Sequence, residues 1–190
     1  TQMQLSNMLE QAKIMSSACD HPDNLIFDRV LLGHSRLIND LKQAIKKASS
    51  VDCTVLITGE TGTGKELVAR ALHEMSDLSG PFIAVNCGGI ANSLIQAELF
   101  GYEKGAFTGA NQQKKGFIEA ADNGTLLLDE IGELAFEQQA NLLRFLQEGT
   151  IQRVGSVDTV KVRVRVIAAT NVDLDRAMYR ERFRADLFYR

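Results

Sequence analysis

The sequence lacks the features that mark secreted, membrane or nucleic-acid-binding proteins. Its three cysteines, Cys19, Cys53 and Cys87, are scattered without a C-x-x-C pair, which argues against a disulfide framework and a structural zinc site. No apolar run has the length of a membrane-spanning helix, and no basic segment followed by an apolar one marks a signal peptide. The formal net charge of -3 provides no global basic field for nucleic acid. We expect a protein of the reducing cytosol, in which another domain or a partner supplies any DNA contact.

What the chain does contain is an ordinary globular composition. Hydrophobic residues make up 45% and charged residues 24% of 190 residues, which predicts one domain with a sizeable core. Cys53 and Cys87 lie beside apolar runs, so we expect them to be buried as small hydrophobic residues.

Residues 1–30 are interpreted as an N-terminal helix and a linker. Apolar side chains recur at helical spacing over 1–19, and "CDHPDN" with Pro22 then breaks the pattern. The helix is either a coiled-coil connector to a regulatory domain or an arm packed on its own domain. The linker suggests that the chain comes from something longer.

From residue 31 onward the patterns of strands and helices alternate. A short buried strand is expected over 54–59, further strands over 81–87 and 124–130, and helices over 64–76, 92–101 and 136–149. Residues 160–171 read as an exposed hairpin arm that runs into a buried strand. This alternation predicts an α/β fold, in which helices cover both faces of a parallel sheet.

A phosphate-binding P-loop is predicted at "GETGTGKE", which follows a strand and opens a helix. Its glycines let backbone N–H groups turn toward phosphates, and Lys65 is expected to reach the β- and γ-phosphates of ATP. The segment comprises Gly59, Glu60, Thr61, Gly62, Thr63, Gly64, Lys65 and Glu66. Glu66 occupies the position where Ser or Thr normally ligates magnesium, so another group has to hold the metal.

Asp129 and Glu130 are the candidates for that metal ligand and for the general base. They end the apolar strand "TLLLDE", and open α/β sheets bind ligands at the carboxyl ends of their strands. Asp129 is expected to hold Mg²⁺, mostly through water, and Glu130 to polarise the attacking water.

Two further groups suit phosphoryl chemistry. Asn171 ends the strand "RVIAAT" and is either a sensor of the γ-phosphate or a helix N-cap. Near the C-terminus, "RERFRADLFYR" carries a run of arginines. Such a run is usually a solvated face, but arginine from a neighbouring subunit also stabilises transition-state charge.

These residues together resemble the AAA+ ATPase domain of bacterial enhancer-binding proteins, the activators of sigma-54 RNA polymerase. The resemblance covers residues 31–190. It rests on "LLGHS", "GETGTGKE", "PFIAVNC", "ELFGYEKGAFTGA", "GTLLLDEIGEL", "LLRFLQEG", "VRVIAATN" and "FRADLFYR". It implies an AAA+ P-loop NTPase fold that here lacks its helical lid.

The resemblance also implies roles for matching residues. Leu32 and Gly33 are expected beside the adenine, and Asn86 is expected to hold the catalytic Glu130 and release it when the nucleotide changes. Arg184 and Arg190 match arginine fingers that act across a subunit interface. Glu66 is common in this family and is therefore a family mark.

The GAFTGA segment is implied to contact sigma-54 from the crown of an insertion in a helix. It comprises Gly105, Ala106, Phe107, Thr108, Gly109 and Ala110. Without the resemblance, an Ω-loop that tucks Phe107 into its own domain is the default. Residues 153–160 match a second loop that moves with the first. Tyr102 stands where His is common, and Glu181 where Gly is common.

The implied protein is a cytoplasmic bacterial ATPase that uses ATP and Mg²⁺. It is expected to form a hexameric or heptameric ring, and a dimer when inactive, and to remodel the closed complex of sigma-54 RNA polymerase holoenzyme. DNA contact is expected through a helix-turn-helix outside this chain, with no membrane partner. The alternative is a nucleotide-binding transcription regulator that acts by assembly without ATP turnover. A GTPase is disfavoured because the chain has no N-K-x-D motif.

Overall fold

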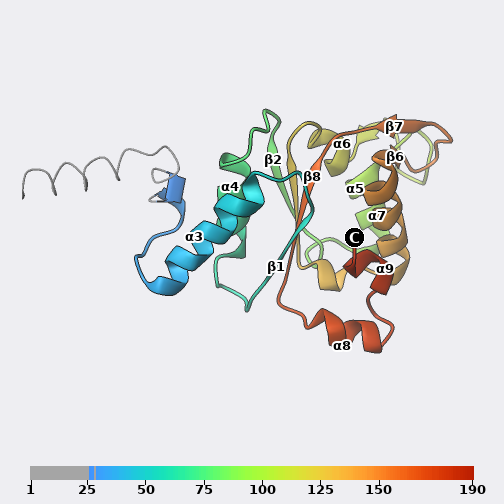
Figure 1. Cartoon of the computed structure of the whole chain (residues 1–190). Coiled ribbons are helices and arrows are strands. Elements are labelled where there is room, and N and C mark those ends of the chain that lie inside the picture. The colour runs from blue at the N-terminus through green and yellow to red at the C-terminus, as the bar shows by residue number, and fades with distance from the viewer. Residues whose placement is uncertain (1–25, 28) are drawn as a thin grey trace, which may run out of the picture.

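The structure is a computed structural model that describes residues 26, 27 and 29–190, so the helix expected over 1–19 lies outside the described residues. A four-stranded parallel sheet with the order β1-β8-β5-β2 forms its centre (Figure 1). The strands are β1 (Val55–Thr58), β2 (Phe82–Asn86), β5 (Thr125–Asp129) and β8 (Arg165–Thr170). Because all four run in the same direction, their carboxyl ends lie at one edge of the sheet.

Helices cover both faces of this sheet, as the alternation predicts. α3 (Arg36–Ser49) and α4 (Lys65–Glu74) lie on one face, and α5 (Asn92–Phe100) and α7 (Phe136–Glu148) lie on the other (Figure 1). Successive strand residues point to opposite faces. Leu127 therefore packs in the cluster with α3 and α4, whereas Leu126 and Leu128 pack in the cluster with α5 and α7.

β1 differs from the buried strand that its sequence predicts. It lies at the edge of the described sheet and alternates between half-buried and exposed residues, with Leu56 exposed. Cys53, just before β1, is exposed as well, so the expectation that it is buried is wrong. Cys87 is buried as expected. Burial, followed by the nearby charges of Asp129 and Glu130, raises the pKa of its thiol to about 12.

Two short ribbons extend from the side of α5 and α7. β3 (Gly101–Tyr102) pairs with β4 (Lys114–Lys115), and α6 (Phe117–Ala120) follows them. β6 (Thr150–Gln152) pairs with β7 (Thr159–Lys161), which confirms the expected hairpin arm before β8. Within the described residues, an isolated bridge joins Tyr102 of β3 to Val154, which lies between β6 and β7.

The remaining elements are short. η1 (Ile131–Glu133) follows β5, and α8 (Leu174–Tyr179) and α9 (Ala185–Phe188) follow β8. No described helix is both long enough and apolar enough to cross a membrane.

Candidate functional site

The predicted P-loop, residues 59–66, connects β1 to the first turn of α4. Gly62 has a φ of 82° and Gly64 a φ of 86°, a left-handed conformation that residues with a side chain rarely adopt. Gly64 is the N-cap of α4 and gives this ten-residue helix no side-chain cap. The first N–H groups of the helix are thus oriented for anionic oxygens, as the phosphate-binding motif requires.

Lys65 folds back onto this loop. Its Nζ donates to the carbonyl oxygens of Gly59 and Glu60, both at 2.9 Å. Thr63 Oγ1 donates to the same Glu60 carbonyl at 2.8 Å. The ammonium is therefore held within the loop, where phosphate oxygens would offer it stronger, charge-assisted hydrogen bonds.

Glu66 pairs with its own helix. Its Oε1 accepts from Nε and a terminal nitrogen of Arg70, at 3.2 and 2.8 Å. Both side chains are about half exposed, so the pair adds little to stability. With Glu66 engaged in this way, a metal ligand has to come from another element.

Asp129 and Glu130 lie at the carboxyl end of β5. Asp129 Oδ1 accepts from the backbone N–H of Glu130 at 2.9 Å. Glu130 has a φ of 54°, a conformation that a residue with a side chain retains only when its surroundings impose it. A Cβ added to Gly88 would lie 2.5 Å from Glu130 Oε2, so the carboxylate lies directly against Gly88.

The donor set at this edge suits magnesium. Nowhere in the described part of the chain do three His, Cys, Asp or Glu side chains gather into a preformed metal site. Mg²⁺ in nucleotide sites is typically bound by one or two carboxylates, the substrate phosphates and water. Asp129, at the end of the strand next to β8, fits that pattern.

Asn86 ends β2 directly opposite Asp129 in the sheet register. Its Oδ1 accepts from the backbone N–H of Gly89 at 2.8 Å. The same oxygen would lie 3.4 Å from a Cβ on Gly88, the residue against which Glu130 packs. Asn86 and Glu130 therefore flank one glycine, and the role of Asn86 in holding Glu130 stays a prediction.

Asn171 contacts the P-loop. Its Nδ2 donates to Thr61 Oγ1 at 3.0 Å, and the N–H of Gly59 donates to the carbonyl of Thr170 at 3.1 Å. The N-cap of α8 is Asp173, whose side chain accepts from Arg176 N–H. The N-cap alternative for Asn171 is therefore wrong, whereas its role as a γ-phosphate sensor stays a prediction.

The GAFTGA segment closes the β3–β4 ribbon between α5 and α6. Gly105 and Gly109 have φ values of 85° and 103°, and Gly105 N–H donates to the Ala110 carbonyl at 2.8 Å. The side chain of Phe107 is 41% exposed, and its ring packs edge-to-face against Tyr102 with 5.0 Å between ring centroids. Phe107 thus has features of both interpretations, an exposed tip and a ring packed on its own domain.

The second loop, residues 153–160, is held against the first by a partly buried ion-pair network. Arg153 donates to Glu103 at 2.9 Å and to both carboxylate oxygens of Glu119 at 2.9–3.1 Å. These hydrogen bonds raise the pKa of Arg153. The backbone adds a bridge between Tyr102 and Val154. The sequence located this loop but did not single out Arg153.

The arginine segment lies beside α7, and it makes no hydrogen bond to the P-loop among the described residues. Arg184 forms a two-nitrogen fork with Asp186 at 3.0 and 2.7 Å, and Arg190 donates to the Leu146 carbonyl at 3.2 Å. The fork raises the pKa of Arg184 and lowers that of Asp186. Glu181 has a φ of 55°, which explains why the resembling family commonly has Gly there.

Comparison with known protein families shows which family the chain belongs to. The family described as "Sigma-54 interaction domain" matches residues 31–190. The chain belongs to this family.

Named relatives of this sigma-54 interaction domain agree. The Nif-specific regulatory protein of Rhodobacter capsulatus is 53% identical over 161 residues, which cover 84% of this chain and 28% of that protein. The anaerobic nitric oxide reductase transcription regulator NorR of Salmonella arizonae is 50% identical, over 100% of this chain and 36% of its own. The chain thus spans about a third of the length of these relatives.

A solved structure supports the AAA+ P-loop NTPase fold. The crystal structure of NtrX from Brucella abortus in complex with ATP superimposes with a TM-score of 0.76 at 35% identity. The match covers 98% of this chain and 42% of that one. This structurally similar protein therefore binds a nucleotide.

Besides Arg153, two residues of this sigma-54 interaction domain were missed by sequence reasoning. One is Gly88, and the other is Gln139 of α7, whose side chain is fully buried. Gln139 Nε2 donates to the carbonyls of Leu134 and Arg182 at 2.8 and 2.9 Å, and its Oε1 accepts from Arg184 N–H at 2.8 Å. Gln139 thereby fixes the backbone that carries Arg184. No local motif marks such a role.

The predicted adenine-contacting residues lie before α3. Leu32 is 81% exposed, and Gly33 has a φ of 126° and accepts at its carbonyl from Lys42 Nζ at 3.2 Å. Leu31, next to them, is buried. Leu32 is therefore accessible to an adenine ring, and this contact stays a prediction.

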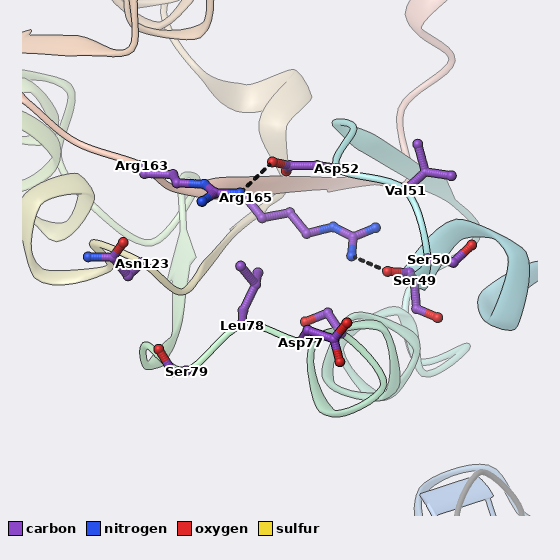
Figure 2. A pocket seen from close by; sticks show the side chains of 11 residues that line it. Ser49, Ser50, Val51, Asp52, Asp77, Leu78, Ser79, Asn123, Arg163 and Arg165 are labelled. Atoms are coloured by element: carbon purple, nitrogen blue, oxygen red, sulfur yellow. Dashed lines mark hydrogen bonds and ion pairs between the residues drawn. The ribbon is translucent and has the colours of Figure 1, made fainter.

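A separate polar hollow of about 270 Å³ lies at the amino end of β8, away from the P-loop (Figure 2). Arg165 crosses it and donates to the carbonyls of Ala48 and Ser49, at 2.6 and 3.3 Å. These carbonyls lie at the C-terminal end of α3, where the helix dipole stabilises a cation. Arg165 is 4% exposed and its Nε has no partner among the described residues. We interpret Arg165 as a cap that fastens α3 to the sheet.

Proposed function

We propose that this sigma-54 interaction domain is the ATP-hydrolysing motor of an activator of sigma-54 RNA polymerase. The observation that carries the proposal is the convergence at one edge of the sheet. The P-loop, Asp129, Glu130 and Asn171 all lie at the carboxyl ends of strands of a single parallel sheet, in a chain that belongs to this family. Open α/β sheets bind their ligands at this edge.

The hydrolytic step uses positioning and charge. Lys65 and the free N–H groups of α4 would bind the β- and γ-phosphates of ATP. Magnesium held by Asp129, largely through water, would neutralise phosphate charge. Glu130 would accept the proton of the attacking water, and Asn171 would contact the γ-phosphate from β8.

Completion of the site requires a second subunit. Because Arg184 and Arg190 point to partners other than their own P-loop, they suit action on the nucleotide of a neighbour in a hexameric or heptameric ring. The transition-state charge would compete with Asp186 for the Arg184 guanidinium. An arginine supplied in this way accelerates phosphoryl transfer by about 10³–10⁵-fold. A dimer is the inactive form in this proposal.

The client is sigma-54. Asn86 would pass the state of the nucleotide to the paired loops, and Phe107 and Thr108 would contact sigma-54 so that the closed promoter complex opens. The exposed ring of Phe107 supports this step, because an apolar anchor gains free energy when a partner buries it. DNA contact belongs to a helix-turn-helix outside the chain.

The test is nucleotide-dependent binding of the full-length protein to sigma-54 with ADP and a metal-fluoride mimic of the γ-phosphate. We expect wild-type protein to bind, and Lys65→Ala to lose binding and at least about 100-fold in ATPase rate. Thr108→Ala should lose binding while it keeps ATPase activity. Full ATPase activity in a folded Lys65→Ala variant would contradict the motor. Binding without turnover in wild-type protein would favour the regulator that acts by assembly.

A further inference from the structure

The ring of Phe107 has a partner within its own hairpin. The centroids of Tyr102 and Phe107 are 5.0 Å apart and the ring planes meet at 62°, an edge-to-face arrangement. Tyr102 is half-buried. Such pairs are stabilised beyond the effect of burying their area, because the positive edge of one ring meets the negative face of the other.

Tyr102 is the fixed member of this pair. It pairs with Lys114 across the β3–β4 ribbon and forms a bridge with Val154 of the second loop. The next residue, Glu103, donates its N–H to the Val154 carbonyl at 3.0 Å. Two neighbouring backbone segments, β4 and the second loop, therefore hold Tyr102 in place.

Phe107 is the mobile member, because glycines carry it on both sides. A Cβ added to Gly105 or Gly109 would meet no atom within 4 Å, so there is free space beside both glycines, whereas Ala106 between them lies against Gly155 of the second loop. Both glycines have the left-handed backbone that lets such a turn rearrange at low cost. The Tyr102 ring is the aromatic contact that opposes movement of the tip.

We propose that Tyr102 is a positioning residue that holds Phe107 on its own hairpin, and that Phe107 leaves Tyr102 before a partner buries its ring. The inference rests on the proposed function and adds a competing, intramolecular partner for the tip. A side chain that anchors an interface is fully desolvated in the partner's pocket. A partner cannot cover the part of the Phe107 ring that Tyr102 already covers. A contact of this strength shifts the balance between held and released tips by about two- to tenfold.

The ring of Tyr102 carries this role. Within the described residues its hydroxyl makes no hydrogen bond. Tyr102→Phe should therefore keep the edge-to-face pair, whereas Tyr102→Leu keeps apolar bulk and removes the ring. These two variants separate an aromatic contact from the general packing of the ribbon.

The first experiment observes the contact directly. The 190-residue chain has three tyrosines, Tyr102, Tyr179 and Tyr189, and the last two are 90% and 82% exposed. In fluorotyrosine-labelled protein, the ¹⁹F resonance that Tyr102→Phe removes belongs to Tyr102. We expect Phe107→Leu to shift that resonance. Phe136→Leu is the matched control, since Phe136 is 42% exposed, and should leave it unchanged. An unmoved Tyr102 resonance in folded Phe107→Leu would overturn the proposal.

The second experiment measures sigma-54 binding by the full-length protein with ADP and no phosphate mimic. Tyr102→Leu should raise the affinity about two- to tenfold, and Tyr102→Phe should behave as wild type. Unchanged or weaker binding by Tyr102→Leu, with wild-type thermal stability, would refute a holding role. If wild-type protein failed to bind sigma-54 in any nucleotide state, the proposed function would be wrong, and the resonance experiment alone would decide the holding role.

Discussion

The nucleotide edge of the sheet and the paired loops are held together in different ways. At the nucleotide edge, Thr58 pairs with Thr170 and Asn86 with Asp129 through the backbone of the central parallel sheet. The loops stand on ribbons with only two or three residues a strand. The loops are joined by two backbone hydrogen bonds at Val154 and by the hydrogen bond from Arg153 to Glu103.

This difference separates the parts that can move from the parts that cannot. Backbone pairs in a central sheet open only with much of the fold, whereas contacts at the end of a ribbon open locally. The groups proposed for ATP chemistry therefore lie on the rigid body. The groups proposed to meet sigma-54 lie where a change of a few side-chain contacts rearranges the surface.

The largest effect, on the rate of ATP hydrolysis, is expected from adding a methyl group beside Glu130. In Gly88→Ala, the new Cβ would lie 2.5 Å from Glu130 Oε2, so the carboxylate has to move. A displacement of about 1 Å of a catalytic group lowers a rate about 100-fold. We expect kcat for ATP to fall by that factor, with nucleotide affinity nearly unchanged.

Gly89→Ala provides the matched control for this variant. Its Cβ would meet Asn86 atoms at 3.6 Å, an ordinary contact. Steady-state ATPase assays of both variants measure the effect. Wild-type kcat in Gly88→Ala would show that Glu130 does not act from its position against Gly88.

A smaller effect is expected from the network between the loops. The side chain of Arg153 is 16% exposed and that of Glu119 only 9%, so Arg153→Ala leaves a nearly buried carboxylate without its cation. We expect a loss of about 2 kcal/mol in the free energy of unfolding, measured in urea. Arg163→Ala removes an ion pair with Asp52 that is 76% and 67% exposed, and should change stability by at most about 0.5 kcal/mol. Equal effects would mean that the Arg153 network does not hold the loops together.

The smallest effect is expected from lowering the pH, which should reduce the free energy of unfolding through a histidine that packs on the central sheet. His73 of α4 lies 2.9 Å from Thr125 Oγ1, and burial is the main reason that its pKa lies below 6.5. The negative charge of Glu74 raises this pKa, whereas the positive charges of Arg165 and Arg70 lower it further. As the pH falls, the unfolded chain therefore binds the proton first. The contribution of His73 to stability is complete above pH 6.5 and is lost below it.

Urea denaturation at pH 7.5 and pH 5.5 measures this effect. His73→Gln should lose less stability between the two pH values than wild type, because a neutral amide replaces the titrating ring. His34→Gln, at an exposed position, should match wild type. An identical loss in all three proteins would exclude His73 as the source.

The nucleotide edge was largely predictable from the sequence because its features are local. The P-loop needs glycines, a strand before it and a helix after it, and all three can be recognised in one continuous segment of the sequence. Strand ends place Asp129 and Asn171 by the same logic. Lys65 contacts the loop that its motif predicts.

The features that sequence reasoning missed depend on residues far apart in the chain. Gln139 bonds to Arg184, 45 positions away, and Gly88 is important only because Glu130 folds onto it. The exposure of Leu56 and Cys53 follows from the place of β1 at the edge of the described sheet, which strand composition does not encode. Local patterns also left Phe107 with two interpretations, because its contact with Tyr102 depends on how the hairpin closes.

The tight approach of the loops at Gly155 restricts how this domain can diverge. A Cβ there would lie 2.8 Å from the Cβ of Ala106, and Gly155 has a φ of 82°. A larger side chain at either position would wedge one loop away from the other. The two positions are therefore expected to vary together among related sequences, so that a change at Ala106 is accepted only with a matching change 49 residues later in the chain.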